Sequence, residues 1–107
     1  MSAIEFFQNQ TLRPIIKMQH TLLIGSFKNY IQIRKIDFSS LTVQKKRSKI
    51  GAVYLKDINY KNRILGVIIG HFTMTEFQYY CLNSSELNKR ILKIVAQRVQ
   101  DSFVEDL

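Results

Sequence analysis

The segment Asn83–Phe103, with the sequence NSSELNKRILKIVAQRVQDSF, determines the predicted fold. Asn83 is a favourable N-cap residue, and Glu86 follows it at the spacing of a capping box. Apolar residues then recur at steps of three and four, the period of an amphipathic α-helix. These residues are Leu87, Ile91, Ile94, Val95, Val99 and Phe103. The sequence therefore predicts a long C-terminal helix with one apolar stripe.

The two faces of this predicted helix have different compositions. The face opposite the stripe is polar, and we expect it in solvent; it carries Lys89, Arg90, Lys93, Gln97 and Gln100. Steps of four residues advance slightly more than one helical turn, so the apolar stripe drifts around the helix. Two interpretations follow: the whole stripe fills a core, or its last part lines an open groove.

Length and composition indicate one domain over residues 1–107, with residues 1–14 as a short N-terminal helix or arm. The chain has 107 residues, of which 46% are hydrophobic, enough to build a core. We expect no membrane span, signal peptide or transit peptide from the sequence. The single cysteine, Cys81, excludes an internal disulfide and a cysteine-based metal site. We expect a cytoplasmic protein, with a nuclear setting as the alternative.

The positive charge is concentrated in the middle of the chain. Residues 13–63 hold 12 of the 16 Lys and Arg residues but only 2 of the 8 acidic residues, within a net charge of +8. Such a region favours anionic partners: nucleic acid, a phosphoinositide membrane or an acidic peptide. The alternative is a lysine-rich surface that serves solubility only. Lys45, Lys46, Arg47 and Lys49 are predicted to form a basic loop that contacts phosphoinositide headgroups.

The segments before the C-terminal helix are predicted to be strands, because they are rich in branched and aromatic residues with partial alternation. Pro14 is expected to prevent a helix through Arg13. The predicted strands cover residues 15–27, 30–38, 41–44, 50–58, 63–72 and 76–82. Short connections favour antiparallel pairing. The prediction is an α+β fold: a curled antiparallel sheet of six or seven strands, or a partly open barrel, closed by the C-terminal helix.

This order of elements resembles the pleckstrin-homology-like superfold, and most closely a phosphotyrosine-binding (PTB) domain. The matching segments are Leu23–Ser26, Ile31–Val43, Val53–Ile58, Leu65–Ile69 and Phe77–Leu82, followed by a helix that ends at Phe103. PTB domains usually insert a helical segment after the first strand, whereas this chain has only residues 27–29 there. In that respect it is closer to minimal pleckstrin-like domains, and no phosphate-binding arginine can be assigned by the resemblance.

The resemblance implies a non-enzymatic adaptor that docks an extended peptide of a partner protein. In this superfold a peptide adds to a sheet edge beside the C-terminal helix. The implied peptide-binding residues are Leu65, Gly66, Val67, Ile68, Ile69, Val95, Val99 and Phe103. Under the alternative interpretation, Val99 and Phe103 belong to the core.

Two other functions remain open, and an enzyme is not expected. His20 and His71 have no supporting motif, and no metal or cofactor is predicted. The first alternative is a small RNA-binding protein with an exposed face of tyrosines and cations. That face would hold Tyr30, Tyr54 and Tyr60 among Arg34, Lys35, Lys56, Lys61 and Arg63. The second alternative is a structural subunit of a larger assembly, in which a partner chain covers Ile64–Ile69.

Overall fold

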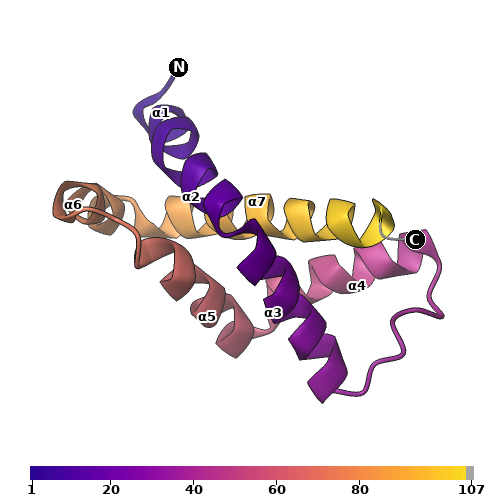
Figure 1. Cartoon of the computed structure of the whole chain (residues 1–107). Helices are drawn as coiled ribbons and strands as arrows, with labels where there is room; N and C mark the ends of the chain where they lie inside the picture. The colour runs from indigo at the N-terminus through magenta and orange to yellow at the C-terminus, as the bar shows by residue number, and fades with distance from the viewer. Residues whose placement is uncertain (106–107) are drawn as a thin grey trace.

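The computed structural model describes residues 1–105, and the side chains of residues 1–103, as an all-helical chain (Figure 1). Its elements are α1 (Ala3–Phe7), the π-helix η1 (Gln8–Leu12), α2 (Arg13–Met18), α3 (His20–Ile33), α4 (Val43–Lys56), α5 (Ile58–Ile69), α6 (Met74–Leu82) and α7 (Ser84–Glu105). There is no strand among residues 1–105. The body measures 44 × 26 × 22 Å. No helix in the described part of the chain is long and apolar enough to cross a membrane.

The predicted α+β fold is therefore wrong, and so is the resemblance to pleckstrin-homology-like and PTB domains. The predicted strand at 63–72 lies mostly in α5, and the one at 15–27 lies in α2 and α3. The physical reason is that the apolar residues also fit a helical period. Leu23, Phe27 and Tyr30 fall on one helical face and are all buried. Tertiary packing of such a face outweighs the weak strand preference of branched residues.

Polar caps fix where the helices begin. The Thr42 hydroxyl accepts a hydrogen bond from the Lys45 amide at the start of α4, at 3.2 Å. Asp57 caps α5 in the same way by accepting from the Tyr60 amide at 3.1 Å. Thr73 and Glu76 form a capping box at the start of α6. Each cap satisfies amides that a helix start leaves unpaired, so these polar residues begin helices instead of making strand turns.

The N-terminal helix continues past Pro14, contrary to the prediction that a helix could not run through Arg13. Pro14 has no amide hydrogen, and its ring crowds the preceding turn of an α-helix. The chain accommodates it with η1, whose wider turn ends where the Arg13 amide donates to the Gln8 carbonyl. Pro14 then occupies the first turn of α2, where a missing donor costs little.

The C-terminal helix is the central element of the fold. α7 packs against η1, α2, α3, α4, α5 and α6, and Figure 1 shows the N-terminal helices crossing it. The predicted helix is confirmed, and the side chains of Leu87, Ile91, Val95 and Val99 are 0% exposed. Asn83 does not act as predicted: it ends α6, and its side-chain Nδ2 donates to the Tyr79 carbonyl at 3.0 Å.

An aromatic cluster joins α3, α4, α5 and the end of α7. Phe27 lies at its centre, with ring-centroid distances of 5.3 to 6.3 Å to its neighbours; they are Tyr30, Phe38, Tyr54, Tyr60 and Phe103. The Tyr30 hydroxyl donates to Asp57 Oδ2 at 2.6 Å, and Arg34 lies over the Tyr30 ring. The Tyr30 hydrogen bond, followed by the Tyr60 amide, lowers the pKa of Asp57. Burial raises the pKa of Tyr54.

Candidate functional site

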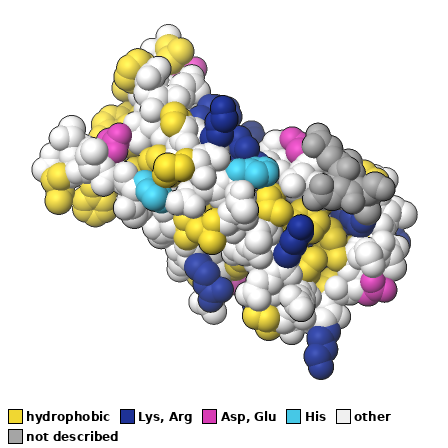
Figure 2. Space-filling view, viewed as in Figure 1, with side chains coloured by type: hydrophobic (Ala, Val, Ile, Leu, Met, Phe, Trp, Pro, Cys, Tyr) yellow, Lys and Arg dark blue, Asp and Glu magenta, His cyan; other side chains and the backbone are white. Residues whose placement is uncertain are grey.

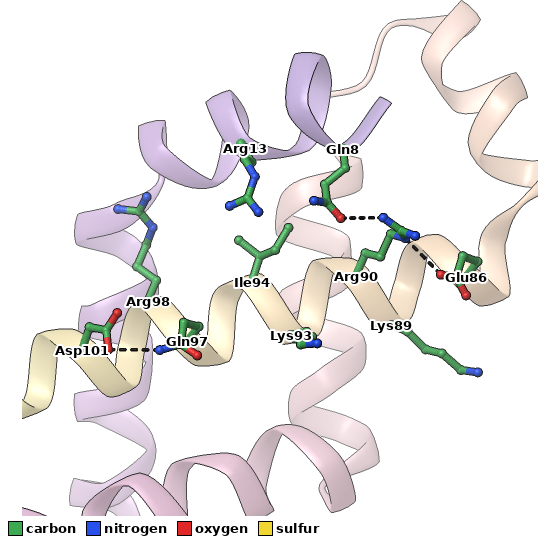
Figure 3. A pocket seen from close by; sticks show the side chains of 10 residues that line it. All are labelled: Gln8, Arg13, Glu86, Lys89, Arg90, Lys93, Ile94, Gln97, Arg98 and Asp101. Carbon is green, nitrogen blue, oxygen red and sulfur yellow. Dashed lines mark hydrogen bonds and ion pairs between the residues drawn. The ribbon is translucent and has the colours of Figure 1, made fainter. Parts of the chain in front are cut away.

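A half-open groove of about 730 Å³ lies between the N-terminal segment and the outer face of α7 (Figure 3). Its lining residues are Gln8, Arg13, Glu86, Lys89, Arg90, Lys93, Ile94, Gln97, Arg98 and Asp101. Five of these side chains are cationic and two are anionic. The groove therefore brings together residues that are up to 93 positions apart in the chain.

The two walls of the groove are held apart by the crossing of helices. Arg13 stands at the start of α2 and points toward α7 above Ile94, while Arg98 points up from α7 (Figure 3). Arg13 Nε donates to Asn9 Oδ1 at 3.2 Å, which holds its side chain in place without neutralising it. Arg98 Nη1 lies 3.1 Å from His20 Nδ1, on α3. An amide and an imidazole, and not a carboxylate, therefore orient the two guanidinium groups.

Both carboxylates of the groove are already paired within the protein. Glu86 forms an ion pair with Arg90 at 3.0 Å, and Arg90 also donates to Gln8 Oε1 at 3.0 Å. Asp101 forms an ion pair with Arg47 at 3.2 Å and accepts a hydrogen bond from the side-chain amide of Gln97. Within the described residues, the other four groove cations, Arg13, Lys89, Lys93 and Arg98, form no ion pair. With Arg47 counted beside the ten lining residues, the groove has an excess of four positive formal charges.

The predicted peptide-binding residues do not form a peptide-binding edge. Residues 65–69 lie in α5, so the sheet edge that the prediction required does not exist in residues 1–105. Ile68, Val95 and Val99 are fully buried. Phe103 packs on Phe38, and the centroids of the two rings are 5.3 Å apart. Leu65, Val67 and Ile69 are partly buried, and Gly66 is exposed. The interpretation of the stripe as core is therefore the correct one for Val95 and Val99.

The predicted basic loop is part of a helix. Residues 45–49 lie in the first turns of α4, where successive side chains point in different directions. Lys45 and Lys49 are exposed, whereas Lys46 is buried and Arg47 is paired with Asp101. These four cations do not share one surface, and their binding to phosphoinositide stays a prediction.

The proposed tyrosine platform for RNA is buried. Tyr30, Tyr54 and Tyr60 have exposed fractions of 9%, 4% and 3%, and their hydroxyls bond within the protein. They cannot stack on bases, because the aromatic cluster around Phe27 covers their faces. The groove residues contain no aromatic side chain either.

The sequence identified some of the groove residues, but it predicted them as a solvated helix face and not as the wall of a groove. The sequence places Lys89, Arg90, Lys93 and Gln97 on the solvated face of the C-terminal helix, but it predicts no helix through Arg13. The missed signal is the four-residue spacing of two buried apolar residues, Leu12 and Ile16. This spacing indicates a helix that continues through Pro14, and that helix places Arg13 toward α7. No group of three metal-ligating side chains occurs among the residues described. The chain matches no protein-family model, no curated protein and no solved structure.

Proposed function

We propose that this protein binds nucleic acid by holding the sugar–phosphate backbone in the groove between the N-terminal helices and α7. One observation carries the proposal: cations converge there from two distant segments, and the two carboxylates that line the groove in the described part of the chain are already paired with Arg47 and Arg90. Such a site attracts phosphates through charge and through the several donors of each guanidinium. A cytoplasmic or nuclear setting is part of this proposal.

The shape of the site favours a polynucleotide strand over a flat membrane surface. A groove surrounds an elongated anion, whereas the headgroups of a membrane would meet only its rim. Gln8 and Gln97 add neutral hydrogen-bonding side chains beside the cations. Because no groove residue is aromatic, base stacking contributes nothing there. We expect phosphate contacts to dominate, with weak sequence preference and strong dependence on salt.

The test compares two variants that remove the same charge. The groove variant carries Arg13→Gln, Lys89→Gln and Lys93→Gln, three exposed residues. The control variant carries Lys45→Gln, Lys49→Gln and Lys56→Gln, also exposed but on α4. Affinity is measured by fluorescence anisotropy with RNA and DNA of 20 nucleotides, single-stranded and duplex, at several salt concentrations.

We expect the groove variant to lose at least tenfold in affinity, whereas the control variant loses much less. The slope of log affinity against log salt falls by roughly 1 for each phosphate contact removed. Equal losses in both variants would show that only the overall charge of +8 matters. No binding of the wild-type protein at low salt would overturn the proposal.

A further inference from the structure

The outer face of α6 is apolar and uncovered. The residues of this face are Met74, Phe77, Gln78, Cys81 and Leu82, which fall on one side of a helical period. Met74 is 70% exposed, Phe77 40% and Leu82 85%, and Cys81 is exposed as well. Only Gln78 on this face is polar. A solvated helix face of a soluble protein is normally polar, so this composition is typical of an interface.

The inner face of α6 is held by few contacts. Tyr79 packs on Phe7 with ring centroids 4.8 Å apart, and the Tyr80 hydroxyl donates to Asn88 Oδ1 at 2.6 Å. None of the nine residues of α6 is buried, whereas its neighbour α5 buries Tyr60, Ile64 and Ile68. A helix this short is marginal by itself and depends on packing. A partner surface packed on the outer face of α6 would supply contacts that the rest of the described chain does not provide.

The charge distribution indicates what can cover this face. All 16 Lys and Arg residues lie within 13–63 and 89–98, so α1 and α6 contain none. Figure 2 shows hydrophobic side chains at the end of the molecule where α6 lies, and no Lys or Arg at that end of the visible face. Two copies of a chain with net charge +8 repel each other over most of their surfaces. They can approach most closely through the cation-free end.

We propose that the outer face of α6 pairs with the same face of a second copy of this chain. A two-fold interface places one patch against itself. In an antiparallel pair of α6 helices centred on Gln78, Met74 of each copy lies opposite Leu82 of the other. The two Gln78 side chains meet at the axis, where their amides can bond to each other. This inference does not depend on the proposed nucleic-acid binding.

The interface is small, so the dimer should depend on concentration. Sedimentation equilibrium of the full chain is expected to show the 12.6 kDa monomer at low concentration and twice that mass at higher concentration. Met74→Lys with Leu82→Lys places cations opposite each other and should give a monomer throughout. Met74→Glu with Leu82→Lys places opposite charges across the axis and should restore the dimer. Met74 and Leu82 are both exposed, so we expect both double variants to fold.

Crosslinking tests the register directly. In a Cys81→Ser background, Gln78→Cys should form a disulfide between copies, because the two positions 78 face each other at the two-fold axis. A disulfide requires Cα atoms within about 7 Å, so a residue far from the axis does not form one. Asn62→Cys, at an exposed site on α5, is the matched control and should not crosslink. A wild-type protein that stays monomeric at several hundred micromolar would overturn the proposal. So would a dimer that survives both lysine substitutions, since another face would then form it.

Discussion

α6 and α7 follow each other in the chain, separated only by Asn83, yet they differ in every respect that matters here. α7 buries an apolar residue at every fourth position and exposes cations on its other face. α6 is the more apolar of the two, yet it buries no residue. Apolar content alone therefore does not place a helix in the core. The outer face of α7 is suited to an anion, and that of α6 to an apolar surface.

The sharpest contrast between the two helices is the effect of a buried charge. Val99→Asp should unfold the protein, because an unpaired carboxylate in the core costs several kcal/mol against a small total stability. Phe77→Asp on α6 should leave the fold intact, since that side chain is 40% exposed. Circular dichroism and thermal melting measure both. If Val99→Asp stayed folded with an unchanged Tm, α7 would not be the core helix.

A milder comparison of the two helices removes side-chain volume instead of adding a charge. Leu87→Ala on α7 is expected to lower the free energy of unfolding by about 2–5 kcal/mol, because it leaves a cavity in the core. Leu82→Ala on α6 should change it by no more than about 0.5 kcal/mol in the monomer. Urea denaturation at low protein concentration measures the two variants. Equal losses would mean that α6 is as well packed as α7.

The smallest expected effect concerns the polar contact between α3 and α5. The pKa of Asp57 is lowered in the folded state, so its ionised form stabilises the fold. That contribution is complete above the unfolded pKa of about 3.8 and is lost as the pH falls through the lower folded value. Asp57→Asn should therefore lower Tm at pH 7, by an amount that shrinks below pH 4. A difference that stays constant from pH 7 to pH 2 would contradict this assignment.

The prediction of the fold succeeded where a helical period continued over a long segment. It failed where a short apolar run fitted both the period of a strand and the period of a helix. Asn83–Phe103 is long enough for its stripe to be unambiguous. Residues 63–72 are rich in branched residues, and only the spacing of Ile64 and Ile68, together with the Asp57 cap, indicates a helix. The resemblance to a sheet fold then depended on those short segments.

The groove could be predicted only in part, because it requires knowledge of tertiary packing. Lys89 and Lys93 are visible on one face of a predicted helix from spacing alone. Arg13 joins them only because η1 carries the chain through Pro14 and across α7. The pairing of Asp101 with Arg47, which removes a negative charge from the groove, links α7 to α4. Sequence spacing does not contain that contact.

The central claim is that the cationic face of α7, and not the apolar face of α6, meets nucleic acid. Titration of the ¹⁵N-labelled protein with a short RNA duplex at low salt tests it residue by residue. The account predicts amide shift changes concentrated in residues 8–17 and 86–101, with residues 74–82 unaffected. Saturable changes confined to α4 or α6, or no change at any RNA concentration, would contradict it.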